Sequence, residues 1–164
     1  MSRTTTITGN QLMGALKALN VNFILGGQSK DTSLHKRPAR LIAALAQSEE
    51  ARLRLSLIPL FLEHPEFAAH ARSVARKLAP PARLTLQCYY SASLWLGQRY
   101  QPQRASLPDH FSRELGLQVT NDPETNLSLL AQRHQQLSGA QVNWLGTYQH
   151  AAQIWLKSLE LHRG

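Results

Sequence analysis

The stretch from Leu84 to Tyr100 (LTLQCYYSASLWLGQRY) limits the possible folds of this chain more than any other part of it. Apolar side chains occupy nine of the thirteen positions from 84 to 96, and on a helical period they cover more than one face. Prolines at 80 and 81 stand where a helix can begin, since the first N–H groups of a helix have no partner within it. The sequence therefore predicts a central helix over about 82–99 that other helices enclose.

Apolar spacing and capping signals predict further helices on both sides of the central one. These include 38–47, 49–62, 65–78, a short helix over 108–115 that Gly116 ends, a helix that Asp122 caps and Gly139 ends, and a final helix over about 147–161. Pro59 is expected to kink the helix over 49–62. We predict an all-α, single-domain bundle of six or seven helices over residues 7–164, after a flexible N-terminus at 1–6.

Composition narrows the class of protein without assigning an activity. Only 17% of the residues are charged, while 43% are apolar, which leaves surface that a partner protein or uncharged polar residues can cover. The single cysteine, Cys88, excludes a disulfide framework within the chain and a cysteine-rich zinc cluster, and it is predicted to be a small buried hydrophobic residue. The chain shows no membrane span and no secretory signal, so we expect a cytoplasmic protein. The histidines are scattered, and the last three have no carboxylate at ligand spacing, so we expect no metal site, and we expect no cofactor.

The distribution of charge is the most specific functional signal. The net charge is +8, and thirteen of the eighteen cationic residues are arginines, which suit planar recognition of phosphate. No Asp or Glu occurs between Phe67 and Pro108, and a second basic group precedes the helix at 38–47. The candidate phosphate-binding or nucleic-acid-binding residues are Lys30, Lys36, Arg37, Arg40, Arg72, Arg76, Lys77, Arg83, Arg99 and Arg104. If they share one surface they form a phosphate-binding patch; otherwise they are solvated or pair with acids elsewhere.

Aromatic and histidine side chains offer two further hypotheses. Trp95 and Tyr100 lie near the arginines, where they either stack on bases or belong to the core. Arg104 and His110 have a spacing similar to the Arg-x4–6-His motif of the HEPN ribonucleases, in which the histidine is the acid/base and the arginine holds the phosphate. Of the remaining histidines, His134 among them, we expect positions on the surface or at the edge of the core.

Several stretches resemble a family of uncharacterised bacterial helical proteins. They are ARLRLSLIPLFLEHPEFA at 51–68, LQCYYSASLWL at 86–96, LPDHFSRELGL at 107–117 and NWLGTY at 143–148. Such proteins are encoded beside nucleotidyltransferase-like partners, as in toxin–antitoxin or defence modules, and the resemblance assigns no catalytic residue. It implies a non-enzymatic interaction subunit, antitoxin-like or accessory, of such an enzyme. We expect the aromatic and leucine-rich surface left by the low charge density to bind the partner, and the basic patch to help hold the shared nucleic acid. The alternatives are a direct RNA- or DNA-binding protein and, third, a HEPN-like ribonuclease.

Overall fold

The computed structural model describes residues 7–21 and 33–162, and every regular element in these ranges is helical. Lys30 and the N-terminal segment 1–6 lie outside the described residues. None of the described helices is long and apolar enough to cross a membrane. In chain order the elements are α1 (Gly9–Ala18), η1 (Leu34–Lys36), α2 (Pro38–Gln47), α3 (Ala51–Leu55), α4 (Leu57–Glu63), η2 (Pro65–Phe67), α5 (Ala68–Lys77), α6 (Pro80–Tyr100), α7 (Ser112–Leu115), α8 (Pro123–Ser138) and α9 (Trp144–His162).

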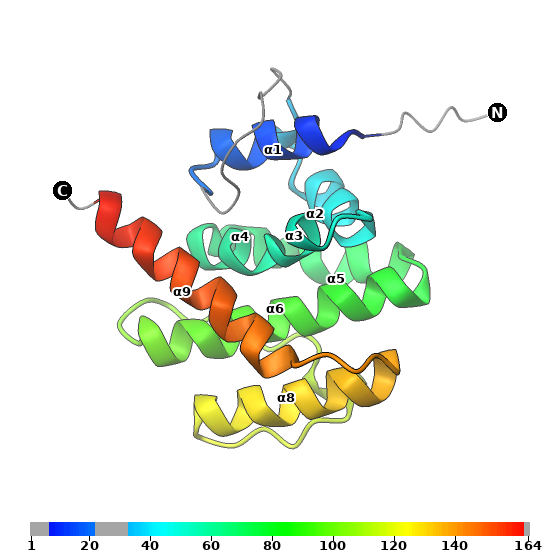
Figure 1. Cartoon of the computed structure of the whole chain (residues 1–164), viewed down its shortest axis with the longest axis vertical. Coiled ribbons are helices and arrows are strands. Elements are labelled where there is room, and N and C mark those ends of the chain that lie inside the picture. The colour runs from blue at the N-terminus through cyan, green and yellow to red at the C-terminus, as the bar shows by residue number, and fades with distance from the viewer. Residues whose placement is uncertain (1–6, 22–32, 163–164) are drawn as a thin grey trace.

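Helix α6 is the centre of the fold, which confirms the all-α prediction and the central helix. Every residue from Leu86 to Leu96 is buried, so this part of the helix is covered on all sides. Helices α2, α4, α5, α8 and α9 all contact it. Figure 1 shows α6 between α4 and α5 on one side and α8 on the other, with α9 crossing the bundle.

The helix predicted over 49–62 is two helices, α3 and α4, because the chain breaks at Ser56. Pro59 explains the position of the break: its ring would collide with the carbonyl group of Leu55, and it has no N–H to donate to that carbonyl. When α4 begins at Leu57, Pro59 lies in the first turn, where no intrahelical partner is required. The Ser56 hydroxyl donates to the Leu53 carbonyl oxygen at 2.5 Å across the junction. The proline therefore moves the helix boundary rather than bending one continuous helix.

The predicted ends of α8 and the predicted stop at Gly116 are confirmed, whereas the helix predicted over 108–115 is found only over Ser112–Leu115 and the final helix begins at Trp144 rather than Thr147. Asp122 caps α8 by accepting from the Thr125 backbone N–H at 3.2 Å, and Pro123 is the first helical residue. A hydrogen bond from the Thr125 side chain is the main cause that lowers the pKa of Asp122. Gly116 and Gly139 end α7 and α8 with φ values of +74° and +69°, which suit glycine far better than other residues.

An aromatic cluster joins α8 and α9 to α6. The imidazole of His134 stacks on the Trp144 ring at a centroid distance of 3.6 Å, and its Nδ1 lies 2.6 Å from the Tyr148 hydroxyl oxygen. Tyr89 of α6 packs edge-on against all three rings. His134 is only 3% exposed, so the expectation that it lies on the surface or at the core edge is wrong. The cause is that Trp144 and Tyr148, which come after α8 in the sequence, fold back over it.

Candidate nucleic-acid interface

Two neighbouring helical segments carry exposed cations that form no ion pair with an acid in the described ranges. Helix α5 presents three of them to solvent, and the segment formed by η1 and the first turn of α2 presents three more. Helices α2 and α5 contact each other, so the two predicted basic groups lie on adjoining elements. We call these six residues the cationic face; they are Lys36, Arg37, Arg40, Arg72, Arg76 and Lys77.

The cations of α5 point outward because its other face is apolar. Ala71, Val74 and Ala75 are buried against the core, at the spacing of one helical stripe. Arg72 and Arg76 are four residues apart and therefore share the opposite face. The small alanines let α5 pack closely while long, charged side chains occupy the solvent side.

The cationic face has no carboxylate partners in the part of the chain that the structure describes. The ion pairs there are Arg52–Glu50, His64–Glu66 and Arg99–Glu124, and none of them involves a residue of this face. Glu66, the acid nearest to α5 in sequence, lies 3.2 Å from His64 Nδ1. Among the described residues, no carboxylate therefore competes with an external anion for these six side chains.

Arg83 lies near α5 but has a structural role. Its Nε donates to the Ala75 carbonyl oxygen at 3.0 Å, and one terminal nitrogen donates to the Leu78 carbonyl oxygen, also at 3.0 Å. These carbonyl groups belong to the last turn of α5 and the residue that follows it, and the last carbonyl groups of a helix lack intrahelical partners. Arg83 therefore closes the end of α5 instead of presenting its guanidinium to a ligand.

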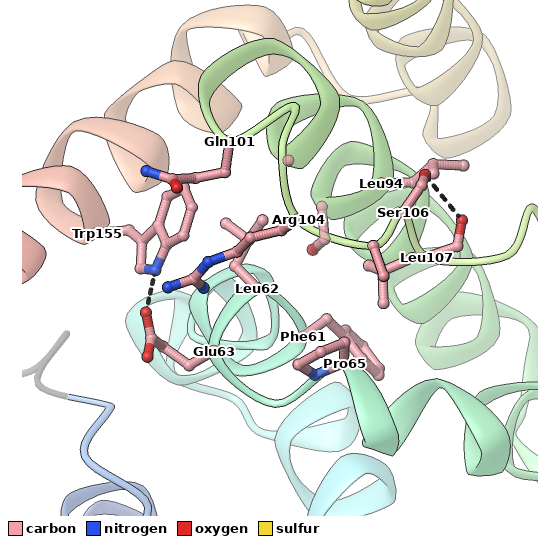
Figure 2. Close-up of a pocket in the computed structure, with 13 residues that line it drawn as sticks. Phe61, Leu62, Glu63, Pro65, Leu94, Gln101, Arg104, Ser106, Leu107 and Trp155 are labelled. Atoms are coloured by element: carbon pink, nitrogen blue, oxygen red, sulfur yellow. Dashed lines mark hydrogen bonds between the residues drawn. The ribbon is translucent and has the colours of Figure 1, made fainter.

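Arg104 lies in the segment that follows α6, at the other end of that helix from Arg83. Arg83 and Arg99 are sixteen positions apart on α6, which corresponds to about 24 Å at 1.5 Å per residue. Arg104 lines a cavity of about 430 Å³ between α4, α6, α9 and the segment 101–107. Figure 2 shows its side chain extending toward Trp155 and Glu63.

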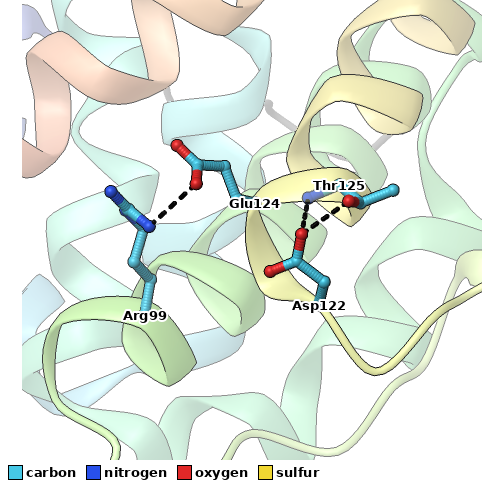
Figure 3. Close-up of polar contacts among 4 residues, drawn as sticks. All are labelled: Arg99, Asp122, Glu124 and Thr125. Carbon is cyan, nitrogen blue, oxygen red and sulfur yellow. Dashed lines mark hydrogen bonds and ion pairs between the residues drawn. The ribbon is translucent and has the colours of Figure 1, made fainter.

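Arg99 also lies at this end of α6, and its guanidinium already has partners within the protein. It pairs with Glu124 at 3.1 Å, which links α6 to the first turn of α8 (Figure 3). Its guanidinium also lies over the ring of the neighbouring Tyr100, 5.3 Å from the ring centroid. The predicted arginines from 72 to 104 thus separate into one group at α5 and two residues at the far end of α6. Trp95 is 1% exposed and belongs to the core, so it offers no ring on which a base could stack.

Arg104 and His110, the pair of the ribonuclease hypothesis, have different neighbours. His110 Nε2 lies 3.1 Å from the Ala68 carbonyl oxygen, and because a carbonyl group only accepts, this nitrogen carries the proton. The imidazole also stacks on Tyr90 at 5.2 Å, and the Tyr90 hydroxyl donates to the Pro108 carbonyl oxygen at 2.7 Å. His110 therefore anchors the segment after α6 to α5, and only Nδ1 is left for proton transfer.

One contact at the cavity joins two residues that are far apart in the sequence. The indole Nε1 of Trp155 donates to Glu63 Oε1 at 2.5 Å, although 92 positions separate the two residues. No local pattern indicates this pair, because it depends on how α9 crosses α4. In the described ranges, no three His, Cys, Asp or Glu residues come together in a way that could hold a metal ion.

Comparison of the chain with protein-family models, with curated proteins and with solved structures gave no significant match. The fold and the surface geometry are therefore the basis for a functional proposal.

Proposed function

We propose that this protein is a non-enzymatic, basic helical subunit that binds nucleic acid directly through its cationic face. The observation that carries the proposal is the set of six exposed cations on α5 and on the η1–α2 segment, none of which has a carboxylate partner among the described residues. Neutralising phosphates with such residues releases counterions, which favours binding and makes it sensitive to salt. Because no aromatic ring is part of the face, we expect weak dependence on base sequence.

A matched pair of triple variants tests this proposal. The first variant, Arg72→Gln/Arg76→Gln/Lys77→Gln, removes the three cations of α5. The control, Arg52→Gln/Arg113→Gln/Lys157→Gln, removes the same number and types of exposed cations from α3, α7 and α9. Both variants therefore have the same net charge, and only the position of the lost charges differs.

The assay is fluorescence anisotropy of a labelled 20-nucleotide single-stranded RNA and of a duplex DNA at 100 mM salt. We expect the α5 variant to weaken binding by about ten-fold or more and the control by less than about three-fold. Equal losses in the two variants, or no binding by the unmodified protein, would contradict direct binding through this face. Circular dichroism confirms that each variant keeps its helical content.

The second candidate is an interaction subunit of a nucleic-acid-acting enzyme, specifically a nucleotidyltransferase-type protein as the sequence resemblance suggests. The expected aromatic surface is not found in the described ranges, where the exposed large apolar side chains are aliphatic. Two of them are Leu137, in the last turn of α8, and Val142, in the connection between α8 and α9. Purification of the tagged protein with a stoichiometric second protein, together with no nucleic-acid binding by the isolated chain, would favour this candidate over the first.

A further inference from the structure

The cavity beside Arg104 has the size and lining of a small-molecule site. Its volume of about 430 Å³ lies within the range of about 300–1,000 Å³ that is typical of ligand pockets. Phe61 and Leu62 of α4, Leu94 of α6 and Leu107 of the following segment supply apolar walls. Gly97 also lines it, and a Cβ there would lie 3.4 Å from Leu62 Cδ2, so α4 and α6 approach closely at this point.

The cavity is lined by one acidic and one basic side chain, Glu63 and Arg104, that do not form an ion pair with each other. Glu63 is held in place because its Oε1 accepts from the indole of Trp155, which is itself 3% exposed. Its second oxygen, Oε2, has no hydrogen-bond partner in the described part of the chain. Arg104 lines the same cavity but forms no ion pair with Glu63. Figure 2 shows both side chains on the Trp155 side of the cavity, with the apolar residues beside them.

This combination selects for a ligand with three parts. A simple anion would bind Arg104 but would be repelled by Glu63, and a simple cation would meet the reverse problem. A ligand that satisfies both residues carries a hydrogen-bond donor edge for the carboxylate, a negatively charged group for the guanidinium, and an apolar body for the walls between Phe61 and Leu107.

We propose that the cavity binds a guanine nucleotide, with the base in the apolar part, its N1–H and N2 amino group donating to Glu63, and its phosphate on Arg104. Guanine offers two adjacent donors on this edge, whereas adenine offers one donor beside a ring-nitrogen acceptor that a carboxylate repels. Arginine binds phosphate in a bidentate, planar manner. The site includes no residue of the cationic face, so this proposal does not depend on the proposed function.

Isothermal titration of the full chain with guanosine 5′-monophosphate (GMP), AMP and guanosine tests the assignment. We expect GMP to bind at least ten-fold more tightly than AMP and than guanosine. Glu63→Gln should reduce GMP binding to the level of AMP, and the Gln carbonyl still accepts from Trp155, so the fold is kept. Arg104→Gln should reduce GMP binding to the level of guanosine. The control Arg113→Gln, on α7, should leave all three affinities unchanged.

Three further measurements separate the possible outcomes. The Trp155 indole N–H resonance of the unmodified protein should shift with GMP and not with AMP, which tests the site without any variant. The α5 triple variant should keep its GMP affinity even if it loses RNA binding, so the two proposals can fail separately. The last measurement is the affinity for an oligouridylate that contains one guanine. If it binds more tightly than GMP, and if Glu63→Gln weakens this binding, the natural ligand is a guanine within RNA. Absence of GMP binding at millimolar concentration, or equal affinity for GMP and AMP, would overturn the proposal.

Discussion

The stability of this protein is expected to fall as the pH drops from about 6.5 to about 4, because His134 is buried in its neutral form. Burial lowers the pKa of His134 from 6.5 to about 4. Between these values the unfolded chain binds a proton at this residue and the folded chain does not. Acidification therefore favours unfolding throughout this range. Below about pH 4 both states are protonated, and this residue contributes no further change.

The magnitude follows from the difference between the two pKa values. A difference of 2.5 pKa units corresponds to about 3 kcal/mol of unfolding free energy, since one unit is worth about 1.4 kcal/mol. Aromatic rings cover the imidazole closely, with Trp144 at 3.6 Å and Tyr89 at 6.0 Å, so relief by water is small. For a typical domain this is a large part of the total stability.

Urea unfolding at several pH values between 7 and 4 measures this effect. The comparison variant is His134→Gln, whose amide can still accept from the Tyr148 hydroxyl but does not titrate. Carboxylates and the other histidines contribute equally to both proteins, so they cancel in the difference. We expect the unmodified protein to lose about 3 kcal/mol more than the variant over this range. Identical pH dependence of the two proteins, or an NMR titration of His134 near pH 6.5, would refute the reasoning.

Three further predictions concern local features. Gly139→Ala and Gly116→Ala should each cost about 1 kcal/mol because a Cβ is strained at φ values of +69° and +74°, while a Cβ at Gly116 would meet the Arg133 guanidinium only at van der Waals distance; urea unfolding of the two variants checks this, and unchanged stability in both would contradict it. Cys88 should resist maleimide at pH 8 until urea unfolds the chain, because burial raises the pKa of its thiol to about 12; rapid labelling of the native protein would contradict this. Tyr90→Phe should cost about 1 kcal/mol through loss of the hydrogen bond to the Pro108 carbonyl, with no change in helical content by circular dichroism; unchanged stability would show that this bond contributes little.

The fold class and the central helix could be predicted from the sequence because their signals are local. The apolar run at 84–96 needs cover on all sides wherever it lies, and Asp122, Gly116 and Gly139 each act on the backbone next to them. The boundary between α3 and α4 at Ser56 was not predicted, since the sequence indicated one kinked helix over 49–62. Pro59 indicates a disturbance in the helix, but whether the chain bends or starts a new helix depends on how α3 and α4 pack.

The candidate site could be predicted only in part. Exposure of Arg72 and Arg76 follows from the apolar stripe on the other side of α5, so their availability could be inferred. The capping role of Arg83 and the pairing of Arg99 with Glu124 depend on the relative positions of separate helices. The contact between Glu63 and Trp155 is of the same kind, because only the crossing of α4 by α9 brings the two residues together.

The salt dependence of RNA binding tests the role of the cationic face most directly. For single strands, the slope of log K against log salt is about −0.7 for each phosphate contact, so six contacts predict a slope of about −4 for the unmodified protein. The variant without the three cations of α5 should show a slope of about −2, and the matched control should keep about −4. Equal slopes in the two variants, or a slope near zero in the unmodified protein, would contradict phosphate binding by this face.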